Sequence, residues 1–316
     1  MLPRVIDRLD PMRDYLPSSP YIGPVAYAKG KGAYHVCPEY HLWGPRQYYK
    51  QEFYRDAKTI FASETGYHGC NSPEGIKKFI APENLWPWVD NDAWIVHAAS
   101  MVVGEPSPYS YRIPLMASHL NVLFGDTVPD GLEDFALASQ ISQSEAKKYF
   151  IERFRTGKIN WERTGIIWWN LIDGWPQFSD AVVDYHYFRK LAFFTIARSQ
   201  EPTCLMFADN AHINGKIELV GVNDPLESKK VSYKVSDVAS GEILLEGDAE
   251  LEANGAKTLA FLDATDEGKL LLIEYQVDGK KLINHYLCGK PTYDYATLRD
   301  LLKKADLLTV EGFEKY

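Results

Sequence analysis

The chain has 316 residues, of which 46% are apolar and 24% are charged, and its formal net charge is −9. At roughly 150 residues per domain this length predicts two domains, and the composition excludes intrinsic disorder and a collagen-like repeat. No run approaches 18 uncharged apolar residues, so we expect no membrane-spanning helix. Lys and Arg are scattered along an acidic chain, which excludes a nucleic-acid-binding surface of the usual basic kind.

The first 200 residues alternate short apolar strands with helical patterns. The strands are expected near Tyr15 and at residues 40–43, 59–63 and 165–171. The helices are expected at about residues 2–9, 74–80, 143–156 and 186–197. This alternation predicts a parallel sheet with helices outside it. The aromatic, Pro-rich stretch 86–130 is a long insertion, of a kind that is often functional.

The rest of the chain has a different composition, because all eight tryptophans lie before residue 176. A helical pattern stops near residues 199–202, so we predict domains at 1–200 and 201–316. After this boundary, short apolar runs alternate with turn signals, of which Asp278-Gly279 is the strongest. About seven strands in roughly 90 residues are typical of an antiparallel, immunoglobulin-like β-sandwich. A short helix near residues 295–305 follows them.

Several motifs of other function classes are missing from the sequence. There is no GxxxxGK[ST] phosphate loop, no HExxH metal motif and no GxSxG nucleophile elbow. No two cysteines have a CxxC spacing, so we expect four free or buried thiols and no metal site. The cysteines are Cys37, Cys70, Cys204 and Cys288.

Two segments carry residues suited to chemistry. Residues 60–66 are an apolar strand that ends in Glu64 and then in glycine, and a carboxylate at such a strand end lies in the active site of an α/β barrel. The alternative for Glu64 is a structural salt bridge. Residues 165–176 are a second strand, which ends in Trp, Asn and Asp; aromatic faces stack on sugars, and Asn and Asp bind hydroxyls. The alternative for these tryptophans is the hydrophobic core.

Six stretches in this order resemble the β-mannosidase-like branch of glycoside hydrolase family 2. They are residues 9–13 with 15–21, 41–44, 61–66, 168–176, 179 with 183–185, and 222–224. The resemblance implies an α/β plus all-β chain: about the last four β/α units of a (β/α)8 TIM barrel, followed by the sandwich. It also implies a retaining exo-β-glycosidase that cleaves terminal, non-reducing β-linked sugars of a glycan and needs no metal or organic cofactor.

The resemblance assigns roles to individual residues. Glu64 matches the catalytic nucleophile, and Trp169 matches the tryptophan that lines the subsite of the terminal sugar. His41 and Trp43 match a strand segment that faces the same pocket, although a histidine at a strand end can also be a core residue. Asp173 either binds a sugar hydroxyl or braces its own turn.

The sequence departs from the family at the second catalytic carboxylate. In the family this glutamate follows an asparagine at the end of strand four, and the present chain has no Asn-Glu pair. We therefore expect the acid/base and the N-terminal half of the barrel to come from elsewhere, in cis or in trans, because half a barrel exposes its edges. The chain is then a fragment, a truncated product or one subunit of a split enzyme, and its compartment is undetermined.

Two alternatives stay open at this stage. The chain is a non-catalytic, carbohydrate-binding or scaffolding remnant of the same fold if no second carboxylate is recruited. If it is catalytic, the sugar is a β-mannoside, β-galactoside, β-glucosaminide or β-glucuronide, and the last is disfavoured because no Arg or Lys cluster marks a uronate pocket.

Overall fold

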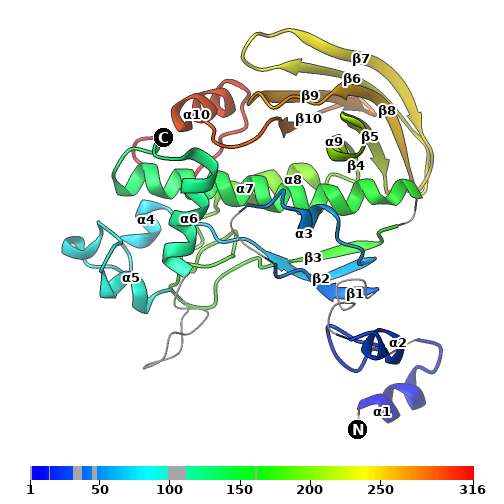
Figure 1. The fold of residues 1–316 in the computed structure, drawn as a ribbon, viewed down its shortest axis with the longest axis horizontal. Coiled ribbons are helices and arrows are strands. Elements are labelled where there is room, and N and C mark those ends of the chain that lie inside the picture. The colour runs from blue at the N-terminus through cyan, green and yellow to red at the C-terminus, as the bar shows by residue number, and fades with distance from the viewer. Residues whose placement is uncertain (1, 14, 31–37, 45–47, 99–111, 161) are drawn as a thin grey trace.

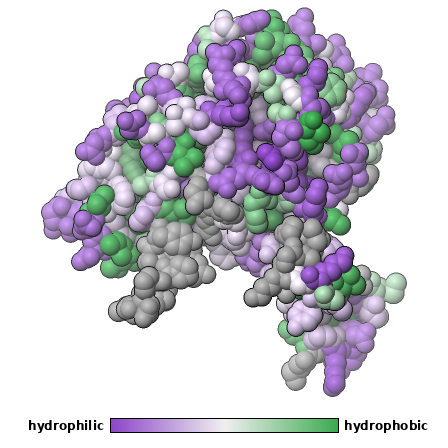
Figure 2. Space-filling model, in the orientation of Figure 1, coloured by the Kyte–Doolittle hydropathy of each residue, from purple (hydrophilic) through white to green (hydrophobic). Residues whose placement is uncertain are grey.

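The structure is a computed structural model that describes residues 2–13, 15–30, 38–44, 48–98, 112–160 and 162–316. Figure 1 shows helix α7 crossing the middle of the molecule, with a small sheet on one side and long antiparallel strands on the other. Helices α1 and α2 lie apart from the rest, and α1 has no buried residue. On the face shown in Figure 2, hydrophobic residues lie in small groups among hydrophilic ones.

The small sheet is parallel and has the order β1-β2-β3. Its strands are β1 (Glu39–His41), β2 (Phe61–Gly66) and β3 (Gly165–Trp169). Three of the four strands expected in this part of the chain are therefore present. The strand expected near Tyr15 is wrong, since residues 15–23 form bends and irregular structure. Pro17 and Pro20 interrupt this segment, and proline has no N–H to give to a strand ladder.

The helices of the first 200 residues vary widely in length. They are α1 (Leu2–Leu9), α2 (Pro24–Ala28), α3 (Glu52–Arg55), α4 (Pro73–Ile76), η2 (Pro82–Asn84), α5 (Asp92–Val96), α6 (Arg112–Phe124), α7 (Leu132–Thr156), η3 (Gly157–Asn160) and α8 (Leu191–Ser199). Helix α7 is longer than the expected 143–156, because it is buried on nearly all sides and has no simple apolar stripe. The stretch 86–130 also contains helices, which were not expected there.

Seven antiparallel strands follow residue 202. They are β4 (Thr203–Asp209), β5 (Lys216–Asn223), β6 (Lys229–Asp237), β7 (Ile243–Leu251), β8 (Gly255–Asp263), β9 (Leu270–Val277) and β10 (Lys280–Leu287), with α9 (Ala211–Asn214) between β4 and β5 and α10 (Tyr295–Lys304) at the end. They form one sheet of order β10-β9-β6-β7 and one of order β4-β5-β8. Asp278 and Gly279 join β9 to β10 with φ angles of 52° and 82°, as a two-residue hairpin turn requires.

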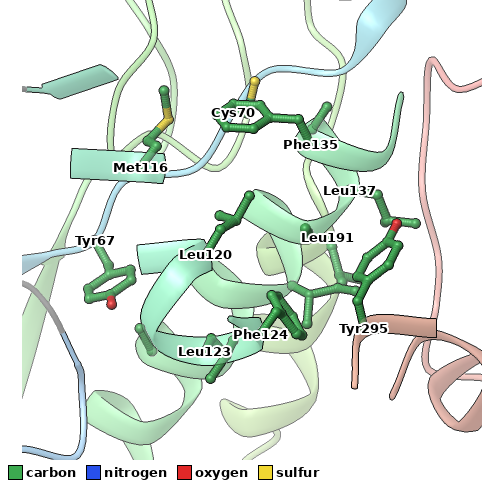
Figure 3. Close-up of a cluster of buried hydrophobic side chains, with 14 of the residues drawn as sticks. Tyr67, Cys70, Met116, Leu120, Leu123, Phe124, Phe135, Leu137, Leu191 and Tyr295 are labelled. Carbon is green, nitrogen blue, oxygen red and sulfur yellow. The ribbon is translucent and has the colours of Figure 1, made fainter. Parts of the chain in front are cut away.

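Two hydrophobic clusters hold these parts together. The larger one brings α6 and α7 against Tyr67, Leu191 and Tyr295, so that α10 from the end of the chain packs on the helices (Figure 3). The other lies between the two antiparallel sheets and includes Leu219 of β5 and Ile273 of β9. Cys70, Cys204 and Cys288 are free and buried, as expected, and Cys37 lies outside the described residues.

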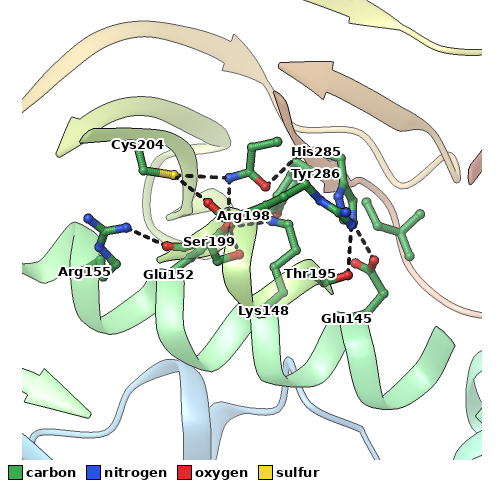
Figure 4. A network of polar contacts seen from close by, with 12 residues as sticks. Glu145, Lys148, Glu152, Arg155, Thr195, Arg198, Ser199, Cys204, His285 and Tyr286 are labelled. Carbon is green, nitrogen blue, oxygen red and sulfur yellow. Dashed lines mark hydrogen bonds and ion pairs between the residues drawn. The ribbon is translucent and has the colours of Figure 1, made fainter. Parts of the chain in front are cut away.

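A buried polar network joins α7 to the antiparallel strands (Figure 4). Glu145 Oε1 lies 2.6 Å from His285 Nε2 of β10, and Asn284 Nδ2 donates to Glu152 Oε1 at 2.8 Å. Lys148 Nζ pairs with Glu152 one turn away at 2.5 Å. Because charged groups are costly to bury unless they are paired, these contacts fix how α7 lies against β10.

Candidate active site

Glu64 lies near the carboxyl end of β2, the middle strand of the parallel sheet. It is in register with His41 of β1, and the ladder shifts between Tyr40 and His41. The backbone N–H of Leu42 donates to the Glu64 carbonyl oxygen at 2.7 Å. The Glu64 side chain is 32% exposed, so solvent and small molecules can reach it.

Two side chains that the sequence singled out contact the Glu64 carboxylate. The indole Nε1–H of Trp43 donates to Oε2 at 2.9 Å, and His41 Nδ1 lies 3.3 Å from the same oxygen. The other oxygen, Oε1, makes no hydrogen bond to any residue that the structure describes. Among the described residues, one oxygen is thus contacted by Trp43 and His41, and the other has no hydrogen-bond partner.

Gly66 explains how Trp43 reaches this carboxylate. A Cβ atom at Gly66 would lie 2.6 Å from Trp43 Cη2 and 2.9 Å from the carbonyl oxygen of Trp169. Both distances are shorter than van der Waals contact allows, so the indole of Trp43 packs directly on the Gly66 backbone. The glycine two residues after Glu64 is therefore a steric requirement of the site.

Trp169 ends β3, the neighbouring strand, and pairs with Gly66 in the parallel ladder. Trp169 is 48% exposed, which leaves its aromatic face available for stacking. Its carbonyl oxygen accepts a hydrogen bond of 2.5 Å from Lys147 Nζ of α7. The structure thus brings Trp169 to the same end of the sheet as Glu64, although the two side chains come from different strands.

Asp173 lies apart from this group. Asp173 is only 3% exposed, and its Oδ1 accepts hydrogen bonds from Ser179 Oγ at 2.6 Å and from Gln177 Nε2 at 2.7 Å. Burial raises the pKa of this carboxyl above its usual value. The geometry corresponds to bracing of the turn, which was one of the two roles expected for Asp173.

Three further residues belong to the site and were missed in the sequence. Ser19 Oγ lies 3.0 Å from His41 Nε2 and donates to Glu39 Oε1 at 2.7 Å; Ser63 donates to the same oxygen. The only sequence signal was the i, i+2 spacing of Glu39 and His41, which puts both side chains on one face of β1. Ser19 has no such signal, because it reaches the site from an irregular segment.

The described residues were also compared with what a metal site and a membrane-spanning helix require. Among them, no group of three His, Cys, Asp or Glu side chains is arranged to hold a metal ion. None of the helices in the described ranges has the length and apolarity needed to cross a bilayer.

The fold matches solved structures of sugar-cleaving enzymes. The β-D-mannosidase of Dictyoglomus thermophilum superposes with a TM-score of 0.72 and 24% identity, over 92% of this chain and 34% of the mannosidase. The exo-chitosanase of Amycolatopsis orientalis, in a complex with PNP-β-D-glucosamine, superposes with a TM-score of 0.58 and 18% identity, over 83% of this chain and 34% of that one. The chain thus shares the fold of these two enzymes, in line with the resemblance to the β-mannosidase-like branch of glycoside hydrolase family 2, and it covers only a part of each.

Two curated relatives found by sequence comparison are also named as sugar-cleaving enzymes. The chain is 28% identical over 182 residues to β-mannosidase B of Thermothelomyces thermophilus, and 28% identical over 130 residues to the exo-β-D-glucosaminidase of Arthroderma benhamiae. The matches cover 48% and 40% of this chain but only 21% and 14% of the relatives. No family profile matches the chain.

Proposed function

We propose that this chain supplies the nucleophile side of the active site of a retaining exo-β-glycosidase that acts on β-mannosides. The observation that carries the proposal is the Glu64 carboxylate, of which one oxygen contacts Trp43 and His41 while the other has no hydrogen bond from the described part of the chain. In the reaction, Glu64 attacks the anomeric carbon and forms a glycosyl-enzyme intermediate, which water then hydrolyses. The half-exposed Trp169 stacks on the terminal sugar.

The carboxyl group that acts as general acid/base belongs to a different part of the enzyme from the residues that contact Glu64. A retaining glycosidase places its two carboxyl groups about 5–5.5 Å apart, and the acid has a raised pKa. Glu39 is a carboxylate on the neighbouring strand β1, but it is buried and accepts three hydrogen bonds. Those bonds outweigh the effect of burial and lower the pKa of Glu39, which is the wrong direction for an acid.

The fold assignment is part of the same proposal. Residues 1–200 form the C-terminal portion of a TIM barrel, and residues 201–316 form an immunoglobulin-like sandwich. Three parallel strands with helices, followed by seven antiparallel strands in two facing sheets, support this division. The remaining barrel strands, in cis or in trans, supply the acid/base and cover the exposed edge strand β3.

The test is Glu64→Gln in the complete enzyme, assayed on aryl β-mannosides. The amide keeps the shape of the side chain but cannot attack, so kcat is expected to fall by several orders of magnitude while the fold is retained. Glu83→Gln, in an exposed turn, is the matched control and keeps wild-type kcat. Near wild-type turnover of Glu64→Gln would refute the assignment, and sugar binding without turnover by the complete wild-type protein would favour the non-catalytic alternative.

A further inference from the structure

The two tryptophans at the end of β3 lie on opposite faces of the parallel sheet. Successive side chains of a strand point to opposite faces, so Trp168 points away from Trp169. Trp168 packs against the hydrophobic cluster that contains Ile151 of α7, whereas Trp169 is half-exposed. Helix α7 therefore lies behind the face on which Trp169 would meet a sugar, and it can act on Trp169 only through the backbone.

Lys147 of α7 makes such a backbone contact. Lys147 is fully buried, and its Nζ donates to the Trp169 carbonyl oxygen at 2.5 Å. The same Nζ lies 5.5 Å from the centre of the Trp168 ring, within the range of a cation–π contact. In the described part of the chain, no other acceptor receives a hydrogen bond from this amino group. One buried amino group thus contacts both tryptophans.

Gly66 of β2 contacts the same carbonyl group. A Cβ atom at Gly66 would lie 2.9 Å from the Trp169 carbonyl oxygen, so the backbones of β2 and β3 touch at this point. The oxygen is therefore in contact with the Gly66 backbone and with Lys147 Nζ, which together restrain the rotation of the Trp169 peptide group. Because the Cα–Cβ bond turns with the backbone, this restraint also limits the directions that the indole can take.

We propose that Lys147 is a positioning residue of the sugar subsite, which acts through the Trp169 carbonyl and fixes the angle at which the indole meets the terminal sugar. The inference deepens the proposed function and rests on it for the sugar. Its structural part, that Lys147 sets the conformation of Trp169, does not depend on turnover and is tested separately.

The hydrogen bond from Lys147 does not depend on the charge of the amino group. Burial lowers the pKa of Lys147 to about 7, and the charge of Asp180 opposes this effect. Both the ammonium and the neutral amine carry N–H groups, so either form donates to the carbonyl oxygen. At pH 9 Lys147 is mostly neutral, and replacing it there by an apolar residue removes the donor without removing a full charge.

A second buried lysine provides a matched control. Lys190, at the N-cap of α8, is 1% exposed, and its Nζ donates to the Gly69 carbonyl oxygen at 2.7 Å. The two lysines thus share their burial and their kind of acceptor, but Lys190 contacts a loop that follows β2. Lys147→Met and Lys190→Met each remove one amino group and keep an unbranched side chain of similar length.

The first test observes Trp169 in the complete enzyme at pH 9, without any assay of turnover. Fluorine NMR spectra of protein labelled with 5-fluorotryptophan report on each indole, and Trp169→Phe assigns the signal of Trp169. Lys147→Met is expected to shift or broaden this signal, and Lys190→Met is expected to leave it unchanged. An unchanged Trp169 signal in Lys147→Met, or an equal change in both variants, would overturn the proposal.

The second test measures steady-state kinetics of the complete enzyme on aryl β-mannosides. An indole that stacks on the sugar binds the ground state and the transition state alike, so its misplacement raises KM and leaves kcat nearly unchanged. We expect Lys147→Met to raise KM about three- to tenfold, the effect of losing one aromatic contact. Lys190→Met is expected to keep the wild-type KM. A fall in kcat at unchanged KM, of equal size in both variants, would indicate a merely structural role and contradict the inference.

Two further variants keep these tests decisive. Lys147→Gln, whose shorter side chain does not reach the Trp169 carbonyl, replaces Lys147→Met if that variant does not fold, and the same results are expected. Gln140→Met, which removes the donor to the Cys70 carbonyl oxygen, replaces Lys190→Met in the same case. If Glu64→Gln keeps full turnover, the proposed function fails, but the spectra still decide whether Lys147 positions Trp169.

Discussion

At the scale of single residues, the contact between Trp43 and the backbone of Gly66 sets the geometry of the site. The indole that donates to Glu64 lies where the side chain of any other residue at position 66 would begin. A change at Gly66 therefore acts on Glu64 through Trp43, although Gly66 itself has no functional group.

We predict that Gly66→Ala destabilises the protein by about 1–3 kcal/mol, the usual cost of overpacking a well-packed position. Its Cβ would lie 2.6 Å from Trp43 Cη2 and 2.9 Å from Asp180 Oδ1, so the indole or the backbone must move. Urea unfolding of the chain measures the free energy. The control is Gly174→Ala, where a Cβ meets no atom within 4 Å; equal stability of the two variants would contradict this account.

At the scale of secondary structure, α7 holds the loops that follow β2 and β3. Gln143 Nε2 donates to the carbonyl oxygens of Tyr67 and Asp180 at 3.0 Å, and Lys147 Nζ donates to that of Trp169. These two residues are one turn apart on one face of the helix. Buried polar side chains on α7 thus satisfy carbonyls that the parallel sheet leaves without a partner.

Lys147 makes the free energy of unfolding depend on pH. Burial lowers the pKa of Lys147 to about 7, whereas an unfolded lysine titrates near 10.5. Above pH 7 the unfolded chain therefore binds more protons than the folded one, and the free energy of unfolding rises with pH. A neutral amine still has N–H groups, so its hydrogen bond to Trp169 survives the loss of the proton.

We predict that unfolding by urea, measured between pH 7 and pH 9, shows this rise in the wild type and a smaller rise in Lys147→Met, because burial also lowers the pKa values of Lys50 and Lys190. The range stops at pH 9 because tyrosines titrate above it. Lys257→Met, which removes an exposed lysine of β8, is expected to keep the wild-type slope. A slope in Lys147→Met as steep as that of the wild type would contradict this account.

At the scale of the whole molecule, the parallel sheet has an edge that no described residue covers. Strand β3 is the last strand of the sheet, and Ile167 is 55% exposed. Leu171, Ile172 and Trp175 continue the exposed apolar surface beyond it. An open apolar edge of this kind pairs with another strand or with another copy of the chain.

We predict that the isolated chain self-associates through this edge and that Ile167→Lys reduces the association. The lysine places a charge on the edge, as natural proteins do to prevent pairing. Light scattering coupled to size-exclusion chromatography measures the mass. Ile243→Lys is the matched control, because Ile243 is 54% exposed on β7, the edge of an antiparallel sheet; an equal effect of both lysines would exclude a specific role for β3.

The sequence by itself was sufficient for features that depend on local patterns. Strand and hairpin signals predicted seven strands after residue 202 and the turn at Asp278-Gly279, because side-chain alternation and positive φ angles are local properties. The strand pattern before Glu64 predicted a carboxylate at a strand end, and the family resemblance implied that His41 and Trp43 face the same pocket. These three residues lie together because neighbouring parallel strands end at the same edge of a sheet.

Only the tertiary structure decided which other residues join the site. Ser19 comes from an irregular segment, and Glu39 accepts from three donors in two separate segments, so no periodicity could indicate either of them. Asp173, which lies in the same motif as Trp169, turned inward to Ser179 instead of outward. The physical reason is that hydrogen bonds between distant segments depend on how the strands pack, and a one-dimensional pattern specifies only which face of a strand a side chain is on.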